Sequence, residues 1–232
     1  MIKTVLIKLS GESLSGQYGH GFDFSYMKTV CTRIKEVHEM GVNIGIGVGG
    51  GNFMRGRDAS QLDRERADYI GMMATIMNSL ALKDVFIKLG VDVYNQSGLE
   101  ISIIDKIDTE KIKKAFEDNK IVIFGGGTGK PFFSTDTGAA LRAKDIDADM
   151  IIKLTNVDGV YDKDPNKDSS AKMYSEVTFK EVLDLELGVM DLSAMEICRD
   201  NNIEIVVTNI DNENALKDIV NGKKVGTRVY ND

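Results

Sequence analysis

Short runs of hydrophobic residues alternate along the chain with longer stretches in which apolar positions recur at helical spacing. Residues 4–9 form a mostly apolar run that Ser10 and Gly11 end, as expected of a buried strand followed by a turn. Apolar positions at helical spacing then fill residues 27–40, and Gly41 follows as a stop signal. The pattern therefore opens with a strand and a helix.

The same alternation continues through the rest of the chain. Further strands are expected at residues 42–48, 91–94, 121–124, 150–154, 203–208 and 225–230. Further helices are expected at residues 63–89, 109–118, 136–146, 179–187, 192–199 and 214–220. Strands that alternate with helices build a mostly parallel sheet, so we expect an α/β fold, a three-layer αβα sandwich. Ligands of such folds collect at the loops beyond the carboxyl ends of the strands.

The composition suits one well-buried core with many tight turns. The chain has 232 residues, of which 42% are hydrophobic, and it carries 23 glycines but only 2 prolines. Residues 162–170 form the most linker-like stretch, but the strand and helix rhythm resumes after it. We therefore interpret it as a mobile loop within a single domain that spans residues 1–232.

The charge and the cysteine content exclude several kinds of protein. A formal net charge of −7 argues against a nucleic-acid or anionic-membrane surface, because such partners require a cationic face. No apolar run approaches the ~20 residues of a membrane span, and the start of the chain lacks the apolar segment of a signal peptide. Both cysteines fall in predicted amphipathic helices, as reduced thiols do. We expect a soluble, cytoplasmic protein.

Four short segments each place a glycine or a charge at the end of a predicted strand. They lie at residues 8–12, 49–52, 125–129 and 156–159. Consecutive glycines let backbone N–H groups converge on an anion, although a single glycine pair is more often a plain tight turn. Two triple-glycine strand exits in one domain favour a phosphate cradle. The series of glycines at residues 45–50 resembles a dinucleotide fingerprint, but its first glycines lie inside the strand, so we reject that interpretation.

Three charged residues are candidates for chemistry. Lys8 ends an apolar strand, where it either meets an anion or carboxylate or reaches water along the edge of the core. Arg55 follows the glycine loop and is either a phosphate clamp or a surface arginine. Asp136 opens a predicted helix and either caps it or takes part in chemistry. His20 and His38 are too few and too isolated for a metal site or a nucleophilic triad.

Taken in order, these segments resemble the amino acid kinase superfamily and, within it, the bacterial-type UMP kinases. The segments that carry the resemblance are residues 8–12, 49–52 with 55–56, 67–72, 127–136, 157–161 with 164–165, and 189–192. The segment around Asp68 and the Pro-Phe-Phe sequence at residues 131–133 are typical of UMP kinases, whereas the glycine loops are general to the superfamily. The resemblance covers essentially the whole chain.

The resemblance implies ATP-dependent phosphorylation of UMP to UDP, in pyrimidine nucleotide biosynthesis. It also implies an acceptor-binding lobe at about residues 1–150 and an ATP-binding lobe at about residues 151–232. Mg²⁺ would arrive through the nucleotide phosphates, with no metal ligand from the chain. Phosphoryl transfer requires mainly in-line positioning and cations over the phosphate oxygens, so we expect electrostatic rather than acid–base catalysis.

The resemblance further implies roles for individual residues. The catalytic residues would be Lys8, Asp136 and Asp191. The ATP-binding residues would be Lys8, Leu9, Ser10, Gly11, Gly51, Arg55, Thr155, Asn156, Tyr161 and Asp164. The UMP-binding residues would be Gly50, Arg55, Asp68, Thr128, Gly129, Lys130, Pro131, Phe132, Phe133, Ser134 and Thr135. In this scheme Asp136 orients Lys8, and Asp68 accepts hydrogen bonds from the ribose hydroxyls.

One residue departs from the family pattern, since similar UMP kinases usually carry Asn at the position of Lys130. The family is typically a homohexamer that GTP activates and UTP inhibits. The segment that corresponds to a GTP response comprises Gly16, Gln17, Tyr18, Gly19, His20 and Gly21. The sequence leaves open selectivity against CMP, another acceptor such as acetylglutamate, carbamate or isopentenyl phosphate, and a non-catalytic nucleotide- or oxoanion-binding protein similar to molybdenum storage proteins.

Overall fold

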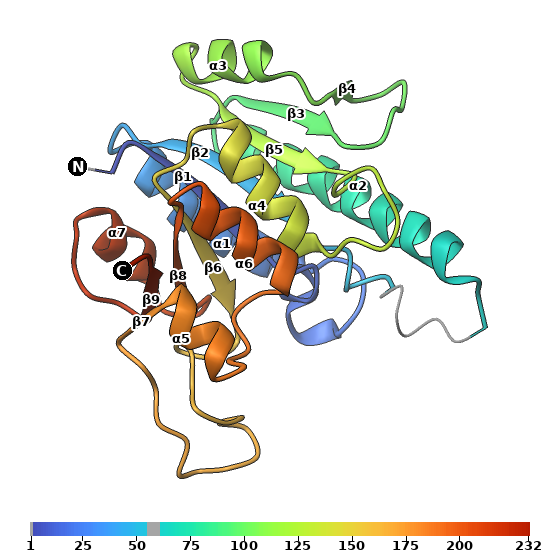
Figure 1. The fold of residues 1–232 in the computed structure, drawn as a ribbon. Coiled ribbons are helices and arrows are strands. Elements are labelled where there is room, and N and C mark those ends of the chain that lie inside the picture. Colours follow the sequence, from blue (N-terminus) through green and yellow to red (C-terminus); the bar gives the residue numbers. More distant parts are fainter. Residues whose placement is uncertain (1, 55–60) are drawn as a thin grey trace.

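A single mixed sheet forms the centre of the computed structural model, which describes residues 2–54 and 61–232. The strand order is β4-β3-β5-β2-β1-β6-β8-β9-β7, and neighbouring strands are parallel except for the antiparallel pair β8 and β9 (Figure 1). The strands are β1 (Thr4–Leu9), β2 (Asn43–Val48), β3 (Val93–Ser97), β4 (Asp105–Lys106), β5 (Ile121–Gly125), β6 (Met150–Thr155), β7 (Glu176–Thr178), β8 (Glu204–Asn209) and β9 (Thr227–Tyr230). The predicted α/β fold with a mostly parallel sheet is confirmed.

Every predicted helix is present, with ends that differ by a few residues. The helices are α1 (Phe24–His38), α2 (Arg64–Lys88), α3 (Thr109–Glu117), α4 (Thr135–Asp145), α5 (Phe179–Asp184), α6 (Leu192–Asp200) and α7 (Ala215–Val220), with a 3₁₀ segment, η1 (Glu12–Tyr18), after β1. The sequence did not predict η1, β4 or β7. They are too short, or too irregular in the case of η1 with its kink at Gly16, to show a hydrophobic period.

Two hydrophobic clusters cover the two faces of the sheet. Because side chains alternate along a strand, Val5 and Ile7 of β1 belong to the cluster that includes α1, α2 and α7, whereas Leu6 belongs to the cluster that includes α3, α4, α5 and α6. Figure 1 shows α4 and α6 next to one another on the second face. This is the predicted three-layer sandwich, and its second face carries the helix that begins at the site described below.

The glycines inside β2 face α4 and the residue that follows it. A Cβ atom on Gly45 would lie 2.7 Å from Cδ1 of Ile146, and one on Gly47 would lie 3.6 Å from the Cβ of Ala139. The first distance is too short for a real Cβ atom and the second is an ordinary contact, so Gly45 serves close packing, in agreement with the rejection of the dinucleotide fingerprint. The close packing fixes where α4 begins relative to the end of β1.

Helix α2 is long and apolar enough to cross a membrane by length and composition alone. The prediction that no segment approaches this character is wrong for α2, because its short polar residues do not offset its many Met, Ile and Leu residues. Half of its most apolar window is buried inside the structure, and residues such as Leu82 and Phe86 belong to the first hydrophobic cluster. Helix α2 is therefore a core helix of the sandwich.

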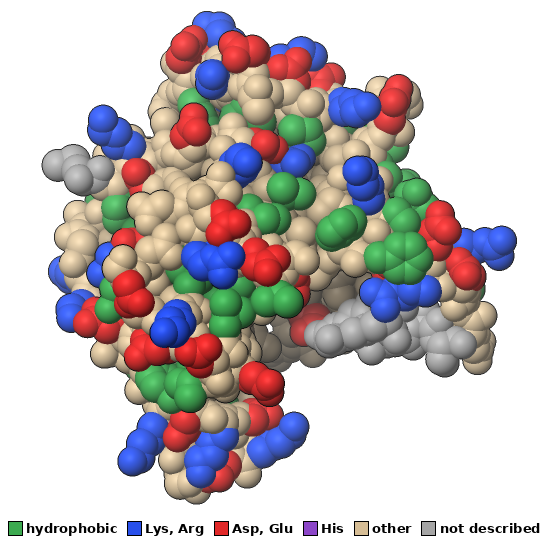
Figure 2. Space-filling view, viewed as in Figure 1, with side chains coloured by type: hydrophobic (Ala, Val, Ile, Leu, Met, Phe, Trp, Pro, Cys, Tyr) green, Lys and Arg blue, Asp and Glu red, His purple; other side chains and the backbone are tan. Residues whose placement is uncertain are grey.

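Both cysteines are buried and free. Burial raises the pKa of Cys31 to about 12, and burial, with smaller contributions from Asp136 and Asp191, does the same for Cys198. Such thiols are unreactive, and their free state agrees with the predicted reduced thiols. On the face that Figure 2 shows, basic and acidic side chains are interspersed rather than gathered into one basic surface.

Candidate active site

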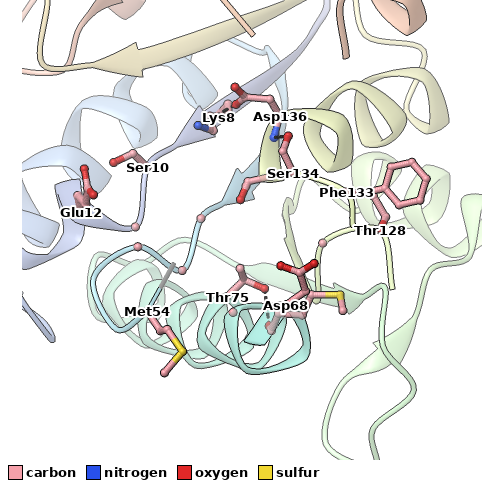
Figure 3. Close-up of a pocket in the computed structure, with 18 of the residues that line it drawn as sticks. Lys8, Ser10, Glu12, Met54, Asp68, Thr75, Thr128, Phe133, Ser134 and Asp136 are labelled. Carbon is pink, nitrogen blue, oxygen red and sulfur yellow. Dashed lines mark hydrogen bonds and ion pairs between the residues drawn. The ribbon is translucent and has the colours of Figure 1, made fainter. Parts of the chain in front are cut away.

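A cavity of about 340 Å³ lies at the carboxyl ends of β1, β2 and β5, between α2 and the start of α4 (Figure 3). Parallel strands that end at the same edge of a sheet bring together residues far apart in the sequence. The predicted site residues that line this cavity are Lys8, Ser10, Gly11, Gly50, Gly51, Asp68, Thr128, Lys130, Phe133, Ser134, Thr135 and Asp136. Lys8 and Asp136 thus share one cavity with the glycine loops that follow β2 and β5.

Lys8 contributes an ammonium group to the cavity, and a carboxylate holds it in place. Lys8 lies in β1 directly beside Lys153 of β6, its register partner on the neighbouring parallel strand. The carboxylate of Asp136, in the first turn of α4, lies between them. Its Oδ1 atom is 2.9 Å from Nζ of Lys8, and its Oδ2 atom accepts a hydrogen bond of 2.9 Å from Nζ of Lys153. Of the two possibilities for Lys8, the structure shows the buried lysine paired with a carboxylate.

The ionisation of this cluster follows from its burial and its charges. Burial raises the pKa of Asp136, but the charges of Lys8 and Lys153 outweigh it, so the net shift is downward. Burial lowers the pKa of Lys153, and Lys8 adds to this, while Asp136 acts in the opposite direction. Nζ of Lys153 also donates a hydrogen bond of 2.5 Å to the carbonyl oxygen of Val189. With all three groups ionised the cluster carries one net positive charge.

The cap of α4 is Ser134 rather than Asp136. Its Oγ atom accepts hydrogen bonds from the backbone N–H groups of Asp136 (2.9 Å) and Thr137 (3.1 Å). Since Ser134 satisfies these N–H groups, the carboxylate of Asp136 is left for the two lysines. The alternative that Asp136 is only a helix cap is wrong.

Asp191 lies outside the cavity lining and joins the starts of two helices. As the N-cap of α6 it accepts a hydrogen bond from the N–H of Ala194 (3.1 Å), and it accepts another from Oγ1 of Thr137 (2.9 Å). It also accepts the hydroxyl hydrogen bond of Ser134, the cap of α4. Asp191 therefore contacts Ser134 and Thr137 at the start of α4. Its catalytic role stays a prediction.

The loops after β1 and β2 pack backbone against backbone, which only glycine allows. A Cβ atom on Gly11 would lie 2.5 Å from the nitrogen of Gly51, and one on Gly50 would lie 2.6 Å from the carbonyl oxygen of Gly71 in α2. Among the described residues, the N–H groups of Gly50 and Gly51 donate to no partner. Because both residues line the cavity, these N–H groups are available to an anion.

Asp68 fixes, through its carboxylate, the third loop of the cavity, which runs over residues 126–134 between β5 and α4. Its Oδ2 atom accepts a hydrogen bond of 2.8 Å from the N–H of Phe132, which has a φ of 70°. Nε of Arg64, one turn earlier in α2, donates to both carboxylate oxygens at 3.1 Å. Asp68 is therefore already a hydrogen-bond acceptor at the cavity wall.

The rest of the third loop divides between the cavity and its outer side. Lys130 and Phe133 line the cavity, whereas Phe132 is exposed and, like Gly129 and Pro131, lies outside the lining. Gly129 instead packs on the neighbouring loop, where an added Cβ atom would lie 2.3 Å from the carbonyl oxygen of Gly98.

The structure does not bring the other predicted ATP residues into this cavity. Thr155 ends β6, and Asn156, Tyr161 and Asp164 follow it in the long segment between β6 and β7, which projects from the sandwich in Figure 1. Asp164 accepts a hydrogen bond from the N–H of Asn166. A second group of residues thus lies along the chain beyond the end of β6.

Leu9 and Arg55 complete the set of predicted ATP-binding residues. The side chain of Leu9 is fully buried in the first hydrophobic cluster, so that only its backbone is left for a ligand. Arg55 lies outside the described residues.

The segment at residues 16–21 adjoins the glycine loop after β2. Gly21 donates its N–H to the carbonyl oxygen of Asn52 (3.0 Å), and its own carbonyl accepts from Nδ2 of Asn52 (2.8 Å). Gly16 and Gly19 have positive φ angles, and Tyr18 is exposed. Its proposed connection with GTP stays a prediction.

Sequence reasoning missed Lys153 and Thr75. Lys153 interrupts the apolar run of β6 just as Lys8 interrupts β1, so the argument applied to Lys8 was available for it. Thr75 is buried in α2, and its Oγ1 atom accepts a hydrogen bond of 2.7 Å from the N–H of Gly126. A threonine inside an apolar helix carries no such signal.

Comparisons with known proteins agree on one group. The sequence model of the amino acid kinase family matches residues 3–209. The solved structure of UMP kinase from Bacillus anthracis is 34% identical, with a TM-score of 0.95, over 100% of this chain and 97% of that chain. UMP kinase from Ureaplasma parvum is 36% identical, with a TM-score of 0.92, over 99% of each chain. Uridylate kinase from Archaeoglobus fulgidus is 26% identical, with a TM-score of 0.76, over 99% of this chain and 100% of that chain.

Proposed function

The chain belongs to the amino acid kinase family, and on this premise we propose that it is a UMP kinase, which transfers the terminal phosphoryl group of ATP to UMP. The observation that carries the proposal is the position of Lys8, whose ammonium group enters a cavity that glycine loops from β1 and β2 also line. During transfer, the phosphoryl group spreads its charge over its equatorial oxygens. An ammonium group and nearby N–H groups stabilise that charge.

Lys8, Asp136 and Lys153, the charged cluster near the end of β1, have different roles in the proposed mechanism. Lys8 lines the cavity and would contact the transferring phosphoryl group, while Asp136 and Lys153 hold its ammonium group at one position. The carboxylate of Asp136 is engaged by both lysines, and the acceptor phosphate is already an anion. Catalysis therefore proceeds through electrostatic stabilisation and positioning rather than a general base.

The acceptor occupies the part of the cavity between α2 and the third loop. Asp68 accepts hydrogen bonds from the ribose hydroxyls, and Gly50, with Arg55 from outside the described residues, holds the acceptor phosphate. The loop residues 128–135 bracket the base. The lining of the cavity supports these roles for Gly50, Asp68, Thr128, Lys130 and residues 133–135, and we assign acceptor binding to the lobe at about residues 1–150.

The donor reaches the cavity from the side of β6. Ser10, Gly11 and Gly51 bind its phosphates, and the segment from Thr155 to Asp164 surrounds the adenosine, in the lobe at about residues 151–232. The two lobes share the sheet, since β1 pairs with β2 on one side and with β6 on the other. Donor and acceptor phosphates therefore meet above β1.

Mg²⁺ would enter with the nucleotide phosphates. The described residues contain no group of three His, Cys, Asp or Glu side chains that could hold a metal ion. Mg²⁺ in kinases binds mainly phosphate oxygens and water, with at most one or two carboxylates, so this cavity fits a metal carried by the donor. Bound there, the ion would neutralise charge on the phosphates.

The expected assembly and regulation follow the family resemblance. We place the protein in the cytoplasm as a homohexamer with GTP as activator and UTP as inhibitor, the response to GTP involving residues 16–21. Exposed apolar residues of α2, Tyr69, Ile70, Met73, Met77 and Leu80, provide a face suited to contact between subunits. Sedimentation analysis tests the assembly, since a monomer at all concentrations would contradict it.

An acceptor panel tests the activity. Purified protein with ATP and Mg²⁺ is offered UMP, CMP, acetylglutamate, carbamate and isopentenyl phosphate in separate reactions, and the products are identified by phosphorus NMR. We expect UDP from UMP as the main product. Turnover of a non-nucleotide alone would assign the chain to another member of the family. ATP binding without any phosphoryl transfer would favour a non-catalytic binding protein.

A further inference from the structure

Helix α2 presents three polar side chains to the loops that line the cavity. Asp68, Thr75 and Asn78 are spaced by seven and three residues, which puts them on one side of the helix. Asp68 and Thr75 hold the third loop, as described above. Asn78 is the third member, and its Nδ2 atom donates a hydrogen bond of 2.6 Å to the carbonyl oxygen of Gly49, at the start of the glycine loop.

Asn78 also forms a reciprocal pair with Asn52, the last residue of that loop. Nδ2 of Asn52 donates to Oδ1 of Asn78 at 3.0 Å, and Nδ2 of Asn78 donates to Oδ1 of Asn52 at 2.8 Å. Asn52 further binds Gly21 through both its side chain and its backbone carbonyl. Asn78 is 0% exposed and Asn52 is 2% exposed. A buried polar network with its groups satisfied fixes one geometry, because any other would leave amides unpaired.

This pair holds both ends of a segment that would otherwise be free to move. Three consecutive glycines lose more backbone entropy on becoming ordered than any other residues. Asn78 binds the carbonyl oxygen of Gly49, the first of the three glycines, and it binds Asn52 at the end of the loop. Gly50 and Gly51, which line the cavity, lie between these two points. The backbone entropy of the loop is therefore lost when the protein folds, and not when phosphates bind.

We propose that Asn78, with Asn52, is a positioning residue for phosphoryl transfer, which sets the backbone of the glycine loop without touching either nucleotide. The proposal rests on the proposed function of the cavity. Displacement of reacting groups by about 1 Å costs on the order of 10²-fold in rate. Loss of the pair therefore lowers kcat as well as phosphate affinity.

Asn95 provides a matched control. It is a buried asparagine, 5% exposed, on β3, and its Nδ2 atom donates to the carbonyl oxygen of Ser79 in the same helix at 3.0 Å. It has no hydrogen bond to either glycine loop among the described residues. Asn78→Ala and Asn95→Ala each remove a buried amide next to α2, so both lower stability, but only the first releases the loop.

The test compares Asn78→Ala, Asn52→Ala, their double variant and Asn95→Ala. Hydrogen exchange of the peptides that cover residues 16–23 and 49–54 is measured with kcat and KM for each nucleotide. We expect faster exchange in both peptides and a kcat lowered by about 10- to 100-fold in the first two variants. The double variant is expected to lose little more than either single variant, because the pair acts as a unit. Asn95→Ala is expected to stay within about threefold of the wild type in kcat.

Equal losses of kcat in Asn78→Ala and Asn95→Ala would overturn the proposal, as would additive losses in the double variant. Should Asn78→Ala fail to fold, Asn52→Ala decides alone, since it breaks the same pair from the loop side. A wild type that does not phosphorylate UMP would contradict the proposed function instead. The exchange data would still decide whether the pair holds the loop.

Discussion

Lys8 and Lys153 lie side by side on adjacent parallel strands, and one carboxylate, that of Asp136, joins their two ammonium groups. Only Lys8 lines the cavity, whereas Lys153 also binds the carbonyl oxygen of Val189. The two lysines are therefore not equivalent. In the proposed mechanism Lys8 acts on the phosphates, and Lys153 holds Asp136 from the side away from the cavity.

Replacement of Lys8 by alanine separates these roles. We expect Lys8→Ala to lower kcat by about 10²- to 10³-fold, the size of the loss when one preorganised transition-state donor is removed. Asp136 keeps Lys153 as a partner, so the circular dichroism spectrum should match that of the wild type. Lys153→Met is the matched variant, and a loss of kcat as large as that of Lys8→Ala would contradict the division of roles.

Asp136→Asn should affect stability as well as rate. The substitution leaves two nearly buried ammonium groups without their carboxylate, and loss of one partner of a buried ion pair costs about 3–5 kcal/mol. Denaturant unfolding at about pH 7 measures this difference. A double variant, Lys153→Met with Asp136→Asn, should regain part of the stability but not the activity. No recovery in the double variant would contradict the electrostatic explanation.

The lowered pKa of Asp136 predicts that the stability difference between wild type and Asp136→Asn depends on pH. The folded state lowers the pKa of Asp136 below its ordinary value of 3.8, so the ionised carboxylate stabilises the folded protein at every pH above that value. This contribution is lost as the pH falls from 3.8 through the folded pKa. The unfolding free energies of wild type and Asp136→Asn should therefore differ most near neutral pH and converge below 3.8. A difference that grows on acidification would refute the assignment.

Asp68→Ala should weaken acceptor binding. The variant removes the acceptor of the hydrogen bond from the N–H of Phe132 together with the proposed partner of the ribose. Hydrogen bonds to a charged group contribute about 1.5–3 kcal/mol, so KM for UMP should rise by about 10- to 100-fold. KM for ATP should change little. An equal rise in both constants would show that the variant disturbs the whole cavity instead.

Lys130→Asn tests the departure from the family pattern. Lys130 lines the cavity, and an ammonium group there attracts the acceptor phosphate over several ångströms. We expect the variant to raise KM for UMP about 3- to 10-fold and to make this constant less sensitive to salt. Initial rates at two ionic strengths measure both effects. An unchanged salt dependence would exclude a direct electrostatic role.

Much of the fold could be predicted from the sequence because hydrophobic period and glycine stops are local properties. The end of β3 could not, because Asn95, Gln96 and Ser97 are polar residues that are nevertheless buried. Their burial depends on partners from other elements, such as Ser79 for Asn95. A local pattern does not contain that information.

The site was predictable to the extent that it lies at strand ends. Lys8 lies near the end of one apolar run and Gly50 follows another, and parallel strands bring such ends together. Whether Asp136 caps its helix could not be decided from the sequence, because Ser134 and Asp136 both stand at the start of α4. The structure shows that Ser134 is the cap and that Asp136 pairs with two lysines from β1 and β6. Asn78 was missed since its function depends on the backbone of a distant loop.

The position of Lys8 within a buried strand also bears on how the chain finds its native state. Its neighbours Ile7 and Leu9 point to the opposite face of the sheet, where the first cluster is apolar. If β1 paired one residue out of step, the ammonium group would enter that cluster away from Asp136, at a cost of several kcal/mol. The charge that we propose for phosphoryl transfer therefore also disfavours a misaligned pairing of β1.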